Sequence, residues 1–250
     1  MLKGRRTLLL VVLFLLTLIT QTLSAAPFEK AQEIYLKPGF DLVGEKLEYA
    51  TSLRGLPVGR QVVEFESRTT YMGREVYVVS FKGYPNLVLK AVNYSNNEVF
   101  YLDTETFLPL YTSRTYSAGF SSGFMESFFL ADSSEIKVQV TESEPRSFTA
   151  KVEDPFHGET TLVLFARFAD VSKYPVIDVF SGVGTQYLQL LPGKDEKVTV
   201  PAGTFDTEVV LISPEIGKVW VSKDRYRIPV KIVLDTNAGL LEMNLISATR

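Results

Sequence analysis

Residues 46–54 read Lys-Leu-Glu-Tyr-Ala-Thr-Ser-Leu-Arg, and residues 61–66 read Gln-Val-Val-Glu-Phe-Glu. The first run alternates between apolar and polar side chains, which is typical of a strand that buries one face. Its predicted buried face consists of Leu47, Tyr49, Thr51 and Leu53. Gly-Leu-Pro-Val-Gly at residues 55–59 has the composition of a turn. The sequence therefore predicts that an antiparallel β-hairpin opens a sheet.

The same alternation recurs along the chain, and short connections rich in Gly, Asn, Ser and Pro separate the runs. Further strands are predicted at residues 75–81, 87–94, 98–103, 109–116, 135–140, 147–152 and 160–165. A five-strand meander is predicted at residues 197–200, 206–212, 218–222, 228–234 and 240–246. Residues 28–36 and 178–190 are predicted to form short helices. The predicted fold is mainly β: a curved antiparallel sheet, rolled or barrel-like, with one or two short helices.

The N-terminus has the three parts of a secretory signal peptide. Lys3, Arg5 and Arg6 precede the apolar run at residues 8–19, and small residues follow it. As a helix this run is shorter than the roughly 30 Å hydrocarbon core of a membrane. We expect cleavage after Ala25; an uncleaved anchor is the alternative. The predicted organisation is a signal peptide at 1–25, a lead-in segment at 26–43 and a single β-rich domain at 44–250.

The charge of the exported part is acidic. The whole chain has 26 basic and 29 acidic residues; removing the three basic residues of the signal leaves 23 and 29, a net charge of −6. Without a basic run, nucleic acid is excluded as a partner. The chain has no cysteine, which excludes thiolate chemistry, disulfides and a lipid-modified cysteine. We expect an exported protein of the periplasm or outer envelope of a Gram-negative-type bacterium, with no membrane helix after signal cleavage.

Residues suited to catalysis are few. His157 is the single histidine, and Asp-Pro-Phe-His-Gly-Glu at 154–159 is typical of a turn, so we expect an exposed loop histidine. Ser-Gly-Val-Gly-Thr at 181–185 lacks the ending of a phosphate loop and is interpreted as structural. The acid pairs are expected to be solvated at strand ends or turns: Asp103 with Glu105, Glu142 with Glu144, and Glu153 with Asp154. We therefore predict no enzyme, and no catalytic, cofactor-binding or metal-binding residue.

Apolar and aromatic side chains concentrate at residues 120–130. They either plug one end of the sheet or form an apolar lip over a cavity that accepts a lipid or another hydrophobic ligand. The candidate lip consists of Phe120, Phe124, Met125, Phe128 and Phe129.

Several strings match one bacterial family. They are residues 44–49 with the turn at 55–59, Val-Pro-Ala-Gly-Thr-Phe-Asp at 200–206, Val-Trp-Val-Ser-Lys-Asp at 219–224 and Arg-Ile-Pro-Val at 227–230. From about Gly44 to Leu245 the chain resembles the bacterial domain of unknown function 3108. The resemblance implies an exported, mostly antiparallel β protein of the envelope, and it supplies no catalytic residue. The motif residues are Gly59, Pro201, Gly203, Phe205, Trp220, Asp224, Arg227 and Pro229.

These motif residues have structural interpretations. Gly59 and Gly203 suit turns, Trp220 suits the core, and Asp224 with Arg227 suits an ion pair across a turn.

Three classes of function remain open. The first is a carrier or binding protein for a hydrophobic or amphipathic envelope molecule such as a lipid. The second is a structural or assembly protein that pairs with an envelope partner through sheet edges. The third is a hydrolase that uses His157 or a carboxylate pair. An outer-membrane barrel is a further architecture, disfavoured by the charged faces of the predicted strands and the C-terminal Ala-Thr-Arg.

Overall fold

The structure, a computed structural model, describes most of the chain beyond residue 33. The described residues are 34–87, 90, 95–118, 121–130, 134–142, 144–152, 156–181, 184–214, 216–236 and 238–250. The predicted signal peptide and Phe120 lie outside them. The strands are β1 Lys46–Leu53, β2 Leu56–Tyr71, β3 Arg74–Pro85, β4 Ser95–Asp103, β5 Pro109–Ala118, β6 Ser121–Leu130, β7 Glu135–Thr141, β8 Arg146–Lys151, β9 Phe156–Gly158, β10 Val176–Phe180, β11 Thr185–Pro192, β12 Glu196–Val200, β13 Gly203–Ser213, β14 Gly217–Ser222, β15 Pro229–Thr236 and β16 Gly239–Thr249. The helices are α3 Thr161–Phe168 and the short 3-10 helix η2 Val171–Lys173.

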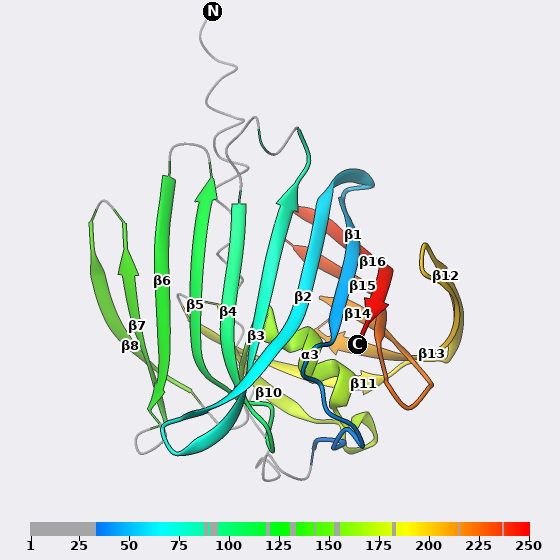
Figure 1. Cartoon of the computed structure of the whole chain (residues 1–250), viewed down its shortest axis with the longest axis horizontal. Coiled ribbons are helices and arrows are strands. Elements are labelled where there is room, and N and C mark those ends of the chain that lie inside the picture. The colour runs from blue at the N-terminus through cyan, green and yellow to red at the C-terminus, as the bar shows by residue number, and fades with distance from the viewer. Residues whose placement is uncertain are drawn as a thin grey trace, which may run out of the picture.

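The strands form one continuous curved sheet. Its order is β8-β7-β6-β5-β4-β3-β2-β1-β16-β15-β14-β13-β11-β10-β9, and β12 pairs with β13 beside this path. Neighbouring strands are antiparallel except β9 and β10, which are parallel. Figure 1 shows β2–β8 as one layer and the C-terminal strands crossing behind it, with α3 between the two. The predicted curved antiparallel sheet is confirmed.

The predicted hairpin and meander are present. In β1 the side chains of Leu47 and Tyr49 are each 1% exposed, while Lys46 is exposed. β1 pairs with β2 and also with β16, so the opening hairpin joins the closing meander in one hydrogen-bonded ladder. The alternation read from the sequence therefore gives the core face directly.

Of the predicted strand at residues 160–165, residues 161–165 form the start of α3, and Thr160 precedes the helix. Seven of the eight residues of α3 are buried, and the helix packs against β9, β14 and β15. Because the segment is apolar on nearly every side, its pattern fits a buried strand and a buried helix equally well. Inside the curl a helix satisfies its own backbone hydrogen bonds, whereas a strand needs neighbouring strands. The strand prediction is wrong for this reason.

The described part of residues 178–190 forms a β-hairpin, not a helix. β10 and β11 pair from Val176 with Gln189 to Phe180 with Thr185, and the Ser181 N–H donates to the Gly184 carbonyl at 2.9 Å. Gly182 and Gly184 weaken a helix, and the β-branched residues of β10 favour a strand. β11 also pairs with β13, and the sequence pattern does not reveal this partner.

Two shorter predictions are also corrected. At the end of the predicted 28–36 helix, Tyr35 bridges to Ala169 and the Leu36 N–H donates to the Phe168 carbonyl at 2.6 Å. In the predicted 87–94 strand, Leu87 and Lys90 are helical, and the Lys90 N–H donates to the Asn86 carbonyl at 2.9 Å. Residues 28–33 and 91–94 lie outside the described residues.

A buried ion pair fixes α3 inside the curl. The Arg167 side chain is 0% exposed and pairs with Glu45, which is 1% exposed; their Nη2 and Oε2 atoms are 3.0 Å apart. Arg167 also donates to the Tyr226 carbonyl at 2.7 Å, and Arg250 reaches Glu45 at 2.9 Å. We call the large apolar cluster around α3, which takes residues from both halves of the sheet, the main core.

Candidate functional site

The two ends of the sheet, β8 and β9, do not pair with each other. Side chains fill this gap instead. We call the apolar cluster between β6–β8 and β9–β10 the seam cluster; its buried members are Ile136, Val138, Val140, Val152, Phe156 and Phe180. The rings of Phe129 and Phe156 meet across it with centroids 4.6 Å apart. The sheet is thus closed by side chains at this one place.

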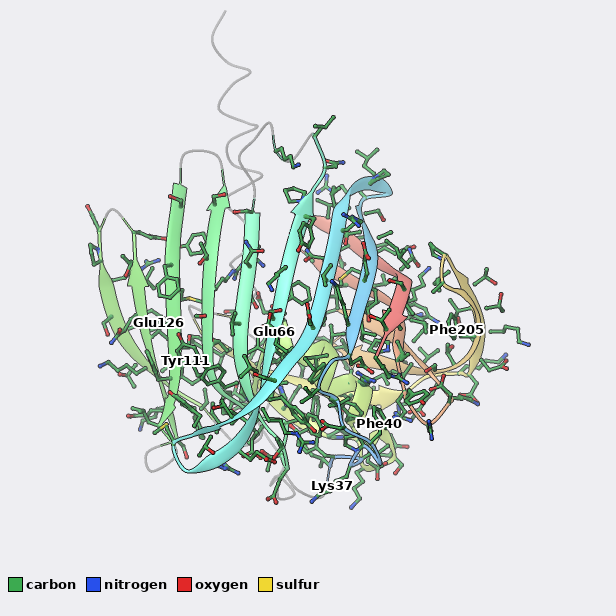
Figure 2. All side chains as sticks on the ribbon, in the orientation of Figure 1. Lys37, Phe40, Glu66, Tyr111, Glu126 and Phe205 are labelled. Carbon is green, nitrogen blue, oxygen red and sulfur yellow. The ribbon has the colours of Figure 1, made fainter. Side chains whose placement is uncertain are left out.

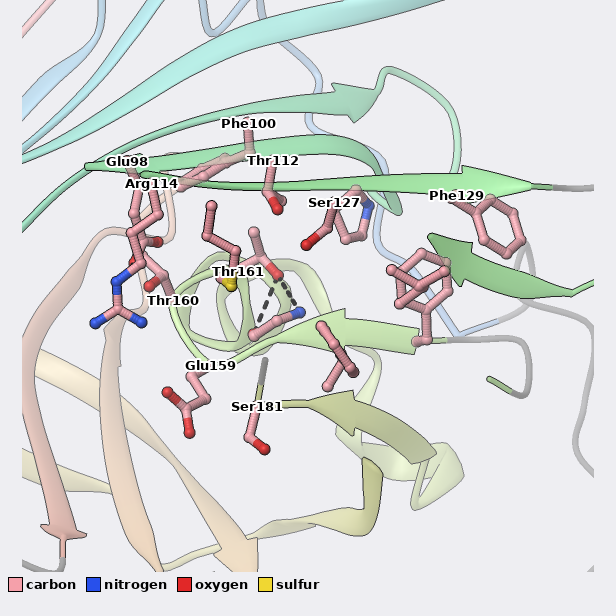
Figure 3. A pocket seen from close by; sticks show the side chains of 16 residues that line it. Glu98, Phe100, Thr112, Arg114, Ser127, Phe129, Glu159, Thr160, Thr161 and Ser181 are labelled. Atoms are coloured by element: carbon pink, nitrogen blue, oxygen red, sulfur yellow. Dashed lines mark hydrogen bonds and ion pairs between the residues drawn. The ribbon is translucent and has the colours of Figure 1, made fainter. Parts of the chain in front are cut away.

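A pocket of about 60 Å³ lies beside the seam cluster, between β4–β7 on one side and the β9–α3–β10 segment on the other. We call it the seam pocket. Its apolar wall consists of Phe100, Pro109, Met125, Phe129, Ile136, Phe156 and Phe180. Its polar wall consists of Glu98, Thr112, Arg114, Ser127, Glu159, Thr160, Thr161 and Ser181. Figure 3 shows Glu98, Arg114 and Glu159 at one side of the pocket and Phe129 at the other, so the pocket is amphipathic.

Two carboxyl groups at the polar side differ in their partners. Glu98 pairs with Arg114 at 3.3 Å, and the Arg114 Nε also donates to the Asn96 side-chain oxygen at 2.6 Å. Within the described residues Glu159 has no hydrogen-bond or ion-pair partner. Burial, with a smaller effect of the Glu98 charge, raises the pKa of Glu159 to about 7, although Arg114 opposes the rise. At neutral pH this carboxyl group is therefore able both to donate and to accept a hydrogen bond.

The hydroxyl groups add hydrogen-bonding capacity. Thr161 is used by the fold, because its Oγ1 accepts from the Gly158 N–H at 2.9 Å and holds the turn into α3. Thr112, Ser127 and Ser181 reach the pocket from β5, β6 and the end of β10. Such a lining suits a hydroxyl or amine group at one side and a short apolar group at the other.

The described residues of the predicted apolar lip lie on both faces of β6, so only some of them reach the pocket. Along β6, Met125 and Phe129 line the seam pocket, whereas Phe124 and Phe128 lie on the opposite face of the strand. On that outer face Phe128 packs against Tyr111 with ring centroids 5.3 Å apart, and the Tyr111 hydroxyl donates to Glu126 at 2.6 Å. Figure 2 shows Tyr111 and Glu126 close together on this face. In the sequence, Gly123, Met125, Ser127 and Phe129 alternate with the residues of the other face, and this alternation could have predicted β6.

His157 is buried, and its predicted exposure is wrong. It lies in β9 with 0% of its surface exposed, on the opposite side of the strand from Phe156. Its Nε2 is 2.7 Å from the Tyr35 hydroxyl, and its ring centroid is 4.4 Å from that of Phe165. Burial lowers the pKa of His157 to about 3, so the ring is neutral. The flanking Pro and Gly suggest a turn, but parallel pairing with β10 extends the segment.

The acid pairs occupy separate places. Asp103, predicted to be solvated, is 2% exposed: it accepts from the Thr106 N–H at 2.8 Å and pairs with Arg74 at 2.8 Å. It therefore fixes the turn between β4 and β5. Glu142 accepts from the Tyr116 hydroxyl and lies near Arg146 at 3.9 Å. Glu153 and Asp154 lie outside the described residues. Neither of the predicted pairs that lie within the described residues lines the seam pocket; Glu98 and Glu159 are the acids that sequence reasoning missed.

Two of the motif glycines have different surroundings. Gly59 lies inside β2 rather than in the hairpin turn, and a Cβ there would be 2.3 Å from the Tyr84 carbonyl oxygen. Close approach of β3, together with a φ of +150°, thus requires glycine. Gly203 has a φ of +137° where the Pro201–Ala202 turn enters β13, as predicted.

The remaining motif residues support the closing strands. Trp220 is 8% exposed and donates to Glu196 at 2.9 Å, while Phe205 packs against the main core. The Pro229 carbonyl accepts from the Tyr49 hydroxyl at 2.8 Å. The predicted ion pair of Asp224 with Arg227 is wrong: Asp224 accepts backbone N–H groups of the turn, and the Arg227 guanidinium pairs with Glu208 at 3.2 Å.

Together these features define a class of protein: a curved antiparallel sheet, rolled around one buried helix, with a small amphipathic pocket where its ends meet. The family model described as "Protein of unknown function (DUF3108)" matches residues 48–246, and the chain belongs to this family. The resemblance inferred from the sequence is thereby confirmed.

The solved structures that match the chain include one with a similar fold. A β-barrel-like protein of the domain of unknown function DUF1849 from Brucella abortus has a TM-score of 0.53 and 9% identity, covering 86% of this chain and 98% of its own. An exported-type protein with a YmcC-like fold from Bacteroides fragilis has a TM-score of 0.36 and 12% identity, covering 87% and 100%. A lipoprotein-type protein from Parabacteroides distasonis has a TM-score of 0.32 and 11% identity, covering 86% of this chain and 99% of its own. No curated protein matches the chain. Among the described residues, no helix has the length and apolar character needed to cross a membrane.

Proposed function

We propose that this protein is an exported, non-enzymatic binding protein of the bacterial envelope that holds an amphipathic envelope molecule in the seam pocket. The amphipathic lining is the observation that supports the proposal: an aromatic and aliphatic wall faces a wall of hydroxyl and carboxyl groups. The signal-peptide pattern at residues 1–25 supports export.

The lining also suggests how the ligand lies. Its apolar group packs between Met125 and Phe129 of β6 and Phe156 of β9. Its polar group, a hydroxyl or an amine, hydrogen-bonds to Glu159, the carboxyl group that has no partner among the described residues. An amine would favour the ionised form of Glu159 and lower its pKa from about 7.

The size of the pocket limits which ligand can enter the closed sheet. About 60 Å³ has room for a few water molecules, whereas pockets for drug-sized ligands reach roughly 300 Å³ or more. A lipid-sized ligand therefore requires β6–β8 to move away from β9–β10. Such movement separates the side chains of the seam cluster and breaks no ladder between β8 and β9, since these strands are not paired.

The arrangement of polar groups supports binding rather than hydrolysis. Glu98 is held by Arg114, and His157 points into the main core away from the pocket lining. Among the described residues, Glu159 is hydrogen-bonded to no base or nucleophile, whereas a hydrolase uses such a hydrogen-bonded arrangement.

The proposal is tested by ligand capture. The protein is expressed from its complete gene, purified from the exported fraction, and extracted with organic solvent for mass spectrometry. We expect a co-purified amphipathic molecule, depleted in the Met125→Trp variant because the larger side chain fills the pocket. Phe124→Trp, one residue away on the outer face of β6, is the matched control and should retain the molecule. Equal recovery from both variants, or an empty wild type, contradicts the proposal.

A second candidate is assembly through the free edge of β8. This strand ends the sheet path, and its residues are mostly exposed, with Arg146 and Lys151 at its ends. An envelope partner could extend the sheet by pairing with it. Ser147→Pro would remove a backbone donor from the strand. Loss of an envelope partner in this variant during affinity purification, with the pocket ligand retained, would favour the second candidate.

A further inference from the structure

Four large apolar side chains are exposed at one end of the sheet. Leu56 is 70% exposed, Leu87 83%, Leu240 49% and Tyr84 48%. We call these four residues the upper rim. Single exposed apolar residues are ordinary on protein surfaces, but a contiguous group marks an interaction site.

The backbone brings the upper rim together from three adjacent connections. The Arg54 N–H donates to the Leu240 carbonyl at 2.8 Å, joining the β1–β2 hairpin to the β15–β16 hairpin. The Asn86 N–H donates to the Val58 carbonyl at 2.9 Å, and its side chain donates to the Pro57 carbonyl at 2.5 Å. Leu56 therefore lies between Leu240 on one side and the end of β3 on the other. Figure 1 shows the β1–β2 hairpin and the end of β3 projecting at the upper edge of the sheet.

Basic residues accompany the rim in an otherwise acidic chain. Residues 54–60, 84–90 and 235–240 contain Arg54, Arg60 and Lys90 against the single acid Asp235. Arg60 pairs with Glu48 and lies over the Tyr84 ring, 5.8 Å from its centroid. Arg54 and Lys90 form no ion pair within the part of the chain that the structure describes. Apolar tips with unpaired cations are complementary to an anionic membrane surface.

The opposite end of the same strands has a different character. Met72, at the β2–β3 hairpin, is 66% exposed, but the charges around it are paired. Arg74 pairs with Asp103 at 2.8 Å, and Arg68 pairs with Asp41 at 2.8 Å. Met72 is the exposed apolar tip of the β2–β3 hairpin, and the charges beside it are compensated, so Met72 provides a matched control.

We propose that the upper rim rests on an anionic phospholipid membrane, with Leu56, Leu87 and Leu240 inserted among the headgroups and Arg54 and Lys90 beside the phosphates. The rim lies at or next to the ends of β2, β3 and β16, outside the seam pocket, so this inference does not depend on the proposed ligand.

Vesicle flotation tests the proposal with protein expressed from its complete gene. Wild-type protein should bind vesicles containing phosphatidylglycerol more strongly than vesicles of phosphatidylcholine, and added salt should weaken the binding. Leu56→Ser and Leu87→Ser should each lower the partition coefficient about tenfold, since each removes an inserted leucine. Arg54→Ala should lower it about fivefold on phosphatidylglycerol only.

The controls separate the rim from the rest of the molecule. Met72→Ser should leave the partition coefficient unchanged, and so should Met125→Trp, which alters only the seam pocket. All variants share one N-terminus, so a difference among them reports on the rim. Equal binding by Leu56→Ser, Leu87→Ser and wild type overturns the proposal. So does a solution dimer that disappears in these two variants, because a second copy would then cover the rim.

Discussion

The main core and the seam cluster close the same sheet in different ways. Around the main core the strands are hydrogen-bonded from β1 through β16 to β13, and α3 fills the space inside. At the seam no ladder joins β8 to β9, and Phe129, Met125 and Phe148 are only partly buried against the cluster. Separating the seam exposes fewer apolar side chains than opening the main core, which breaks strand pairing as well.

The difference teaches where a binding site is compatible with a stable fold. A pocket beside paired strands would enlarge only at the expense of the ladder. A pocket beside the seam enlarges by parting side chains, which costs about the apolar surface exposed. The charged groups of the two regions differ in the same way. The Arg167 guanidinium is fully paired inside the main core, whereas the Glu159 carboxyl faces the seam pocket.

The largest expected effect concerns the buried ion pair of the main core. Arg167→Met leaves Glu45 buried with only the partly exposed Arg250 as a partner. We expect a loss of about 3–5 kcal/mol in the free energy of unfolding, measured by urea denaturation. Arg250→Met removes a pair to the same carboxylate, but Arg250 is 28% exposed, so its loss should be below about 1 kcal/mol. Similar losses in the two variants would show that α3 is not held by the Arg167–Glu45 pair.

The next effect is a pH dependence of stability, which arises from the titration of His157 in the main core. Its pKa is about 3 in the folded protein against 6.5 in the unfolded chain, so the unfolded chain binds more protons between these values. Stability therefore falls as pH decreases from 6.5 toward 3, by up to about 1.4 kcal/mol per pH unit. His157→Gln lacks this titration. It should be about 1 kcal/mol less stable than wild type at pH 7, through the altered contact with Tyr35, and more stable at pH 4.5.

Chemical denaturation of both proteins across this pH range checks the prediction. Groups other than His157 titrate in both, so their contributions cancel in the difference. A difference that does not change with pH would mean that His157 is accessible to protons in the folded protein.

The parts of the fold that the sequence predicts well are those where local pattern and tertiary surroundings agree. β1, β2 and the C-terminal meander have one buried and one exposed face, so alternation and turn residues identify them. The motif strings in the same strands identify the family. These segments supply a large part of the main core, and the rest comes mainly from the lead-in segment, the β3–β5 region, α3, β10 and β11.

The errors fall where neighbours decide the structure. Residues 161–165 are apolar on nearly every side, and only the space inside the curl makes them a helix. Residues 178–190 have helix-compatible spacing, but β13 offers an edge to pair with. His157 has turn-like neighbours, and its burial depends on Tyr35, which is 122 residues away in the sequence. The seam pocket combines Glu98, Met125 and Glu159 from distant segments, so no local pattern could assemble it.

The smallest effect concerns Glu159, two residues from His157 but facing the seam pocket. Its pKa is about 7 when folded against 4.5 unfolded, so the folded protein binds the extra proton between these values. Stability therefore falls as pH rises through this window, opposite in sign to His157. Since Glu159 is partly exposed, we expect roughly 2 kcal/mol. Glu159→Gln keeps the neutral shape and should match wild type near pH 4.5 and exceed it at pH 8, by urea denaturation. A difference that stays constant with pH would mean that the carboxyl group is already solvated, and that the seam stands open without a ligand.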